Sequence, residues 1–313
     1  MTTTPSTSGA GPAPEWLQKK ERGSVLWLGI MRRLSLLFGR RLSRVVVYGI
    51  AWYFLLSAKS VRQASRAYLE RVLRRPAGWR DLYRHILTFS TTIHDRLYLL
   101  NNRYDLFDIR IFDAERVHAL HASGSGCFLF GAHLGSFEML RSVARDNPNL
   151  RVCVAMNPEN ARQINASLAA INPDVMLDII TLGPLDAMLE IHHRLQGGAM
   201  VGLLADRASG PDRYLELPFF GSAAPFPTGP FRTAVMLRHP VYFMAGLYRG
   251  GNRYDVHFEL LTDFTGPPMA NRQDEVCELL TKYVAALERY CYAEPFNWFN
   301  FYDFWKPADR ETT

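Results

Sequence analysis

Two side chains that could do acid–base chemistry, His133 and Glu138, lie near the middle of the chain. The apolar residues before them predict a buried strand that ends just short of His133. We expect His133 on the loop after this strand and Glu138 in the first turn of a helix that Ser136 caps. The carboxylate could then face the imidazole, fix its tautomer and stabilise it once it takes a proton. A general base needs this support.

Both residues also have structural interpretations. The helix dipole favours a glutamate in a first turn without any role in catalysis. A single histidine at a strand end is often only a hydrogen-bonded structural residue. The small residues Gly131, Ala132 and Gly135 favour catalysis, because we expect them to leave room for a substrate.

No other catalytic motif competes with this pair. The sequence has no G-x-S-x-G nucleophile elbow, no phosphate-binding P-loop and no H-E-x-x-H metal motif. His192 and His193 have no companion ligands nearby, so we expect no metal, and nothing indicates a cofactor. No C-x-x-C pair occurs, and we expect buried free thiols at the four cysteines: Cys127, Cys153, Cys277 and Cys291.

After about residue 100, short apolar runs alternate with helical patterns. This alternation predicts an α/β fold with a central mixed, partly parallel sheet flanked by helices. The turn residues 249–252 predict an antiparallel pair at the end of the sheet. The predicted strands are 127–132, 151–155, 178–181, 200–205, 241–247 and 254–260. The predicted helices are 136–145, 159–171, 185–196, 229–238 and 271–292.

The N-terminal quarter is basic and apolar. Residues 15–96 carry 17 Lys and Arg against 5 Asp and Glu, whereas the whole chain has a net charge of +6. The apolar run 45–58 is shorter than the roughly 20 residues that span a bilayer. We therefore expect a helix in the membrane interface, with arginines on anionic head groups and aromatic rings at the boundary. The arginines are Arg40, Arg41, Arg44 and Arg62, beside Lys59; the rings are Trp27, Trp52 and Tyr53.

One structural alternative for this N-terminal quarter remains open, and nucleic-acid binding is a weaker one. It could be a buried core helix with a solvated basic face. Nucleic acid is not an expected partner, because long aliphatic runs suit lipid better than a phosphate backbone. The predicted organisation is a disordered tail over 1–14, a membrane-associated helical region over 15–100 and an α/β core over 101–313, packed with the helices as one unit. No cleavable signal peptide is expected, since arginines interrupt the first apolar run.

Five segments together resemble the lipid A late acyltransferases, the lauroyl/myristoyl group of the lysophospholipid acyltransferase superfamily, in its predicted-acyltransferase branch. The resemblance covers about residues 20–305. Glu138 stands where many glycerophosphate-type members have Asp, and their E-G-T-R block is absent, which points away from a lysophosphatidate substrate. The segments are GAHLGSFEMLR (131–141), VGLLADR (201–207), LPFFGSAAPFPTGPF (217–231), PVYFMAGLYRGGNRYDVHFE (240–259) and NWFNFYDFW (297–305).

The resemblance implies transfer of a fatty acyl group from an acyl carrier protein or coenzyme A thioester to a hydroxyl or amine of a lipid or glycolipid-like acceptor. His133 would be the general base, assisted by Glu138. Arg207, beside Asp206, would bind an acidic acceptor group or the oxyanion. A local Asp206–Arg207 ion pair is the alternative. Arg249 is a further candidate for an anionic group.

The aromatic and glycine-rich segment around 217–231 is expected to shape the acyl or acceptor pocket, through Phe220, Gly221 and Gly229. Ordinary core packing is the alternative for these residues. The expected location is the cytoplasmic face of the bacterial inner membrane, where thioester donors are made. Two other functions remain open: a lipid-binding protein of the same fold without turnover, and a thioesterase that transfers the acyl group to water.

Overall fold

The computed structural model describes residues 24–140, 150–158, 160–162, 171, 178–183, 186–207 and 214–305. The predicted tail over 1–14 and most of the predicted helix over 159–171 lie outside these residues. The side chain of Trp27 also lies outside them. The predicted domain boundaries near residues 14 and 100 stay predictions.

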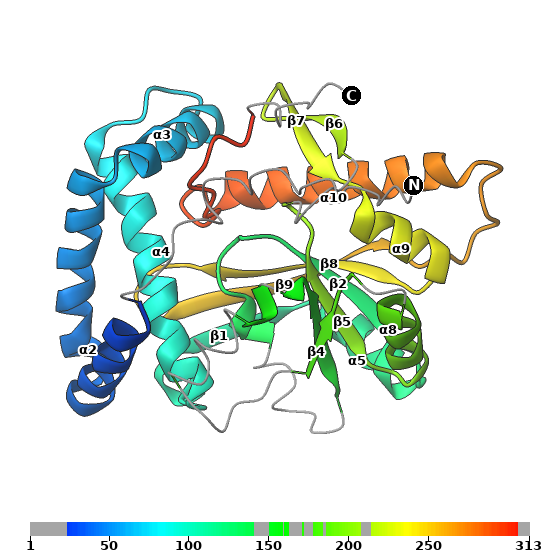
Figure 1. Cartoon of the computed structure of the whole chain (residues 1–313), viewed down its shortest axis with the longest axis horizontal. Helices are drawn as coiled ribbons and strands as arrows, with labels where there is room; N and C mark the ends of the chain where they lie inside the picture. The colour runs from blue at the N-terminus through cyan, green and yellow to red at the C-terminus, as the bar shows by residue number, and fades with distance from the viewer. Residues whose placement is uncertain are drawn as a thin grey trace, which may run out of the picture.

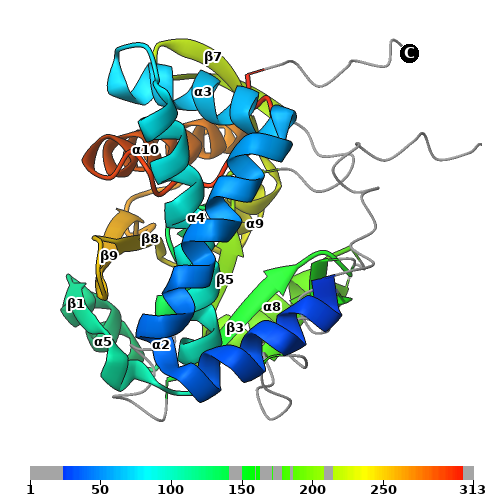
Figure 2. The same ribbon diagram turned by 90° about the vertical axis from the view of Figure 1, so that its left-hand side faces the viewer.

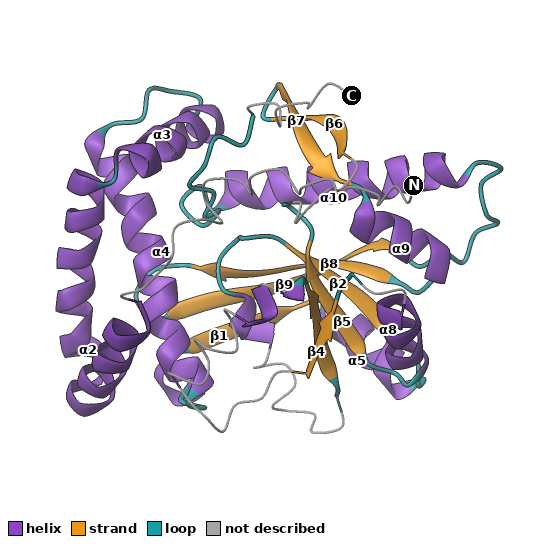
Figure 3. Cartoon of the chain, in the orientation of Figure 1, coloured by secondary structure: helices purple, strands orange, loops and turns teal. Residues whose placement is uncertain are grey.

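A seven-stranded mixed sheet forms the centre of the molecule, in the order β1-β9-β8-β2-β5-β3-β4 (Figures 1 and 3). β2 pairs in parallel with β5 and β8, and β8 and β9 form the expected antiparallel pair. The α/β fold class is therefore confirmed. The strands are β1 (Asp108–Phe112), β2 (Cys127–Gly131), β3 (Val152–Met156), β4 (Asp178–Thr181), β5 (Met200–Leu204), β8 (Val241–Tyr248) and β9 (Arg253–Thr262).

Both faces of the sheet are covered, which explains why the central strands are continuously apolar. Phe128 and Phe130 of β2 point into one core cluster, and Leu129 points into a second. The first cluster includes residues of α8 (Asp186–Gln196), α9 (Gly229–Leu237) and α10 (Arg272–Ala293). The second includes Val117 of α5 (Ala114–Ala122) and Tyr104 of the 3-10 turn η1 (Tyr104–Leu106).

Three N-terminal helices stand at one end of the sheet: α2 (Ser24–Ser57), α3 (Lys59–Leu73) and α4 (Trp79–Leu100). Figure 2 shows α2 as the outermost of them, crossing in front of α4. Gly39, with φ 75°, kinks α2, so two helical segments meet there. Val47, Ala51 and Leu55 are buried at four-residue spacing, which gives α2 one inward face.

Two of the arginines expected on lipid head groups are used inside the protein instead. Arg40 makes a bidentate pair with the buried Asp95, through Nε and Nη2 at 2.7 Å each. Arg44 donates to the Tyr248 hydroxyl at 2.8 Å and to the Gly251 carbonyl at 2.5 Å. A buried carboxylate needs a partner, and exposed loop carbonyls accept readily, so these contacts fix α2 to the rest of the fold.

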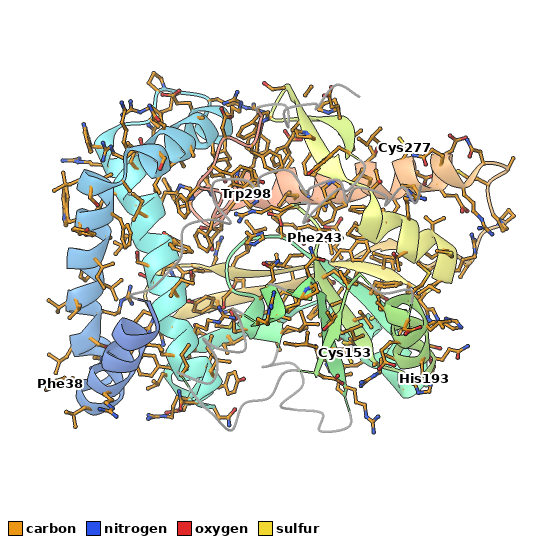
Figure 4. The ribbon with its side chains drawn as sticks, viewed as in Figure 1. Phe38, Cys153, His193, Phe243, Cys277 and Trp298 are labelled. Atoms are coloured by element: carbon orange, nitrogen blue, oxygen red, sulfur yellow. The ribbon has the colours of Figure 1, made fainter. Side chains whose placement is uncertain are left out.

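In the part of the chain that the structure describes, no helix is both long and apolar enough to cross a membrane. The outer face of α2 is nevertheless strongly apolar. Phe38, at the outer edge of this helix in Figure 4, is 55% exposed. The other exposed apolar side chains of α2 are Leu37, Leu42, Val45, Val46, Tyr48, Trp52, Tyr53, Phe54 and Leu56.

Predicted strands agree with the observed ones to within two residues, but three strands were not predicted. β1 is largely exposed, so its apolar residues show no buried pattern. β6 (Tyr214–Phe219) and β7 (Ser222–Pro227) form a separate antiparallel hairpin. Pro218 and Pro225 in the sequence argue against strands here. Both strands of a two-stranded ribbon are edge strands, however, and edge strands tolerate proline. The four cysteines are free as expected, and Cys277 alone among them is not fully buried.

Candidate active site

Neighbouring parallel strands bring His133 and Asp206 together. β2 and β5 are in register, with Gly131 opposite Leu204. Each candidate residue lies two positions beyond its strand. Because parallel strands end at the same edge of a sheet, the two side chains meet there.

Asp206 holds His133 at two atoms. The His133 Nδ1 lies 2.9 Å from the Asp206 Oδ1, and the His133 backbone N–H donates to Oδ2 at 3.0 Å. Trp298, labelled in Figure 4, donates its indole N–H to the same Oδ2 at 3.1 Å. A carboxylate only accepts, so Nδ1 carries the ring proton and Nε2 has a free lone pair. Asp206 is fully buried, whereas the His133 side chain is 34% exposed, so a substrate can approach the ring.

The electrostatics of this pair suit a general base. Burial and the positive charge of Arg207 lower the pKa of His133, and Asp206 offsets part of this effect. Burial alone would raise the pKa of Asp206, but the His133 ring and Arg207 outweigh it and hold that pKa well below its ordinary value. At neutral pH the pair is therefore a neutral imidazole on an ionised carboxylate.

The loop that carries His133 is held between β8 and the C-terminal segment. The Ser136 N–H donates to the Gly246 carbonyl at 2.8 Å, and the Phe299 N–H donates to the His133 carbonyl at 2.7 Å. Gly135 has φ 68°, and a Cβ there would lie 2.0 Å from the Gly246 oxygen. Only glycine fits this backbone. Gly135 thus serves close backbone packing.

Glu138 contacts Arg96 and Ser136. It belongs to the 3-10 turn η2 (Phe137–Met139), and residues 141–145 of the predicted helix lie outside the described part. Its Oε1 is 2.5 Å from the Nε of Arg96 on α4, and its Oε2 accepts from the Ser136 hydroxyl at 3.1 Å. Ser136 therefore does not cap a helix with its side chain. The carboxylate in contact with His133 is that of Asp206, and the tighter turn directs Glu138 toward α4.

Arg207 lies next to the pair. Its Nη2 donates to the Phe299 carbonyl at 2.7 Å, and its guanidinium lies 5.1 Å from the centre of the Tyr302 ring. Its Nε is buried and has no hydrogen-bond partner among the described residues. A buried N–H without a partner is costly, so this atom is available to an anionic group of a substrate.

The residues expected to shape the pocket lie in the aromatic core above the sheet. Phe220 packs on Tyr68 and Tyr292, and its N–H donates to Glu288 at 2.8 Å. Gly221 follows it in the turn of the β6–β7 hairpin, and Gly229 begins α9. The cluster reaches the site indirectly, because the Phe219 ring lies 5.3 Å from that of Trp298.

Arg249 is not beside His133 either. It lies in the β8–β9 turn, where it pairs with Asp255 at 3.2 Å and with Glu294. Trp298 and Arg96 were not predicted as site residues. The partnership of His133 with Asp206 could have been inferred, since both follow predicted strands. Nothing in the sequence indicates that Trp298 would reach the carboxylate.

Residues 84–307 match the sequence model of a family described as bacterial lipid A biosynthesis acyltransferases. The match covers well over half of the chain and includes the whole of the site described above. A search of curated proteins gave no significant match.

Proposed function

We propose that this chain, which belongs to the bacterial lipid A biosynthesis acyltransferase family and is an acyltransferase, uses His133 as the general base of acyl transfer. The donor is a fatty acyl thioester, and the acceptor is a hydroxyl or amine of a lipid or glycolipid. The observation that carries the proposal is the His133–Asp206 pair, with Nδ1 bound to the carboxylate and the ring partly exposed.

In the proposed reaction, the His133 Nε2 takes the proton of the acceptor as its oxygen or nitrogen attacks the thioester carbonyl. Asp206 holds the Nδ1–H and stabilises the imidazolium. The tetrahedral intermediate then collapses, the carbon–sulfur bond breaks, and His133 returns the proton to the thiolate. The products are the acylated acceptor and the free thiol of the carrier.

Two further residues support this reaction. Arg207 stabilises the oxyanion or an acidic group of the acceptor, for which its unpaired Nε is suited. Glu138 remains a proposed member of the site. Its charge would favour the imidazolium, and the ion pair with Arg96 fixes its position in η2.

The donor is acyl carrier protein or, as the alternative, coenzyme A. Carrier proteins are acidic, and the N-terminal quarter presents exposed cations such as Arg41, Lys59 and Arg66. This complementarity favours the carrier protein. It would speed the encounter more than it tightens the complex.

The membrane interface is the proposed working place, on its cytoplasmic side. The support is α2, which exposes apolar side chains on both sides of its kink at Gly39; Leu37 is 77% exposed and Val45 66%. An apolar helix face of this size beside exposed cations is typical of a helix that lies in the interface plane. Such a position would bring a lipid acceptor to the enzyme without a spanning segment.

Product analysis tests the proposal. Purified protein is given a labelled acyl thioester with and without a lipid extract, and acyl-lipid and free fatty acid are measured separately. The expected result is acyl-lipid formed only when the extract is present. Free fatty acid at the same rate in both reactions would identify a thioesterase, and no turnover would point to a lipid-binding protein. Lipid profiles of a deletion strain and its complemented form would then identify the acceptor.

A further inference from the structure

A polar cavity of about 270 Å³ lies between α4, the β8–β9 hairpin and the C-terminal segment. It is smaller than the roughly 300–1,000 Å³ of a typical drug-sized ligand site. Its size suits a single polar group, not a whole lipid. Arg44, Arg84, Arg249 and Arg253 line it, and Glu294 is the carboxylate that faces them.

The charges of this cavity do not balance. Glu294 and the nearby Asp255 both pair with Arg249, so four arginines face two carboxylates and a net charge of +2 remains. In the part of the chain that the structure describes, Arg44, Arg84 and Arg253 have no carboxylate within ion-pair distance. Three guanidinium groups around one small cavity repel each other, so an anion between them would be stabilised.

The three arginines are held in place without losing all their donors. Arg44 is fixed by the Gly251 carbonyl and the Tyr248 hydroxyl. Arg84 lies over the Phe296 ring, 4.2 Å from its centre, and Arg253 donates to the Arg249 carbonyl at 3.4 Å. A guanidinium has five N–H donors, so each keeps several for a ligand. Thr91 also lines the cavity.

We propose that this cavity binds a phosphate group, either the head group of a phospholipid or that of a soluble phosphate monoester. Arginine is suited to phosphate because its planar fork makes paired, charge-assisted hydrogen bonds to two oxygens. Phosphate also offers oxygens in several directions, as three arginines from different elements require. The cavity is separate from the His133–Asp206 pair, although Asn297 in its wall accepts from the Gly135 N–H of the His133 loop at 2.8 Å.

Direct binding tests this proposal independently of acyl transfer. Calorimetry at constant ionic strength would use the full chain with glycerol 3-phosphate as the soluble probe. Co-sedimentation would use phosphatidylcholine vesicles with and without phosphatidate as the lipid probe. The test variant is Arg84→Gln/Arg253→Gln. The matched control is Arg232→Gln/Arg272→Gln, which removes two exposed arginines outside the cavity.

The expected result is saturable binding that the test variant weakens about tenfold or more, while the control stays within about twofold of wild type. Binding of both probes would show that the phosphate group suffices. Phosphatidate dependence alone would identify a lipid head group. Since α2 is unchanged in both variants, its contact with vesicles cancels in the comparison. Equal losses in the two variants, or no variant-sensitive binding of either probe, would overturn the proposal.

Discussion

At the scale of single residues, the contact between the His133 Nδ1 and the Asp206 Oδ1 decides which ring nitrogen can accept a proton. The sequence places a second carboxylate, Glu138, close to His133 along the chain, but its contacts are with Arg96 and Ser136. The two carboxylates therefore have different tasks in the proposed mechanism. Asp206 orients the base directly, and Glu138 acts from the neighbouring turn.

Asp206→Asn should lower kcat by about 10²–10⁴-fold, because the amide can donate to Nδ1 and hold the wrong tautomer. Glu138→Gln should lower kcat less, since it removes a charge without touching the ring. Steady-state kinetics of both variants gives the comparison, with Asp263→Asn on the surface as the control. A larger loss for Glu138→Gln than for Asp206→Asn would contradict the assignment of Asp206 as the orienting residue.

The acid limb of the plot of kcat/KM against pH should shift when Arg207 is replaced. Burial and the Arg207 charge lower the pKa of His133. Arg207→Gln removes the positive charge, and the pKa of His133 therefore rises. As the pH falls, His133 is then protonated at a higher pH than in wild type. The limb should therefore move to higher pH. A limb that stays in place or moves to lower pH would mean that His133 does not titrate in it.

At the scale of elements, two parallel strands and one tight loop build the site. The loop depends on Gly135, whose left-handed backbone lies against Gly246. The position of His133 therefore depends on Gly246 of β8. The C-terminal segment holds the same loop, through the hydrogen bond from the Phe299 N–H to the His133 carbonyl.

Gly135→Ala should reduce activity severely, because a Cβ there would lie 2.0 Å from the Gly246 oxygen and would push the loop away. Gly124→Ala is the matched control. Gly124 also has a positive φ, 77°, but a Cβ there meets nothing within 4 Å. Both changes carry the left-handed backbone cost of about 1–2 kcal/mol. The measurement is the activity per folded molecule of the two variants. Equal activities would show that the close approach of Gly135 to Gly246 does not position His133.

The elements of the sheet could be predicted because each buried strand is a short apolar run between turn residues. The ends of β2 and β5 were correct to one residue, which put His133 and Asp206 at strand ends. Their pairing depends on strand order and register, which no local pattern contains. The direction of Glu138 depends on a 3-10 turn in place of an α-helical one. The β6–β7 hairpin was missed because its prolines resemble a loop.

At the scale of the whole molecule, the apolar outer face of α2 and the sheet edge with His133 belong to one folded body. The contacts of Arg40 with Asp95 and of Arg44 with the β8–β9 turn join α2 to the core. An enzyme that works on lipid needs its site near the interface. In the proposed membrane-bound state, the α2 face would supply the apolar contact and the proposed phosphate cavity a polar one.

Leu42→Ser/Val45→Ser/Leu56→Ser should shift the protein from membranes to the soluble fraction. These side chains are 63%, 66% and 65% exposed, so the fold loses little. Burial of each contributes about 1.5–3 kcal/mol, and the partition onto vesicles should fall by about two orders of magnitude or more. High salt alone should release little of the wild type, since salt screens only the charges.

The control for this experiment is Leu189→Ser/Met236→Ser/Met269→Ser, which changes three exposed apolar residues away from α2. Sedimentation with vesicles at low and high salt measures both variants. If the control is released as readily as the α2 variant, or if wild type is wholly soluble at low salt, α2 is not the membrane contact.

Acyl transfer by His133→Ala tests the central claim most directly. Purified wild type, His133→Ala and the exposed control His193→Ala are given the same labelled thioester donor and lipid extract, and acyl-lipid is measured over time. Circular dichroism and thermal unfolding confirm that all three are folded. We predict that His133→Ala is slower by about 10²–10⁴-fold and that the control is unchanged. Near wild-type turnover by folded His133→Ala would contradict His133 as the general base.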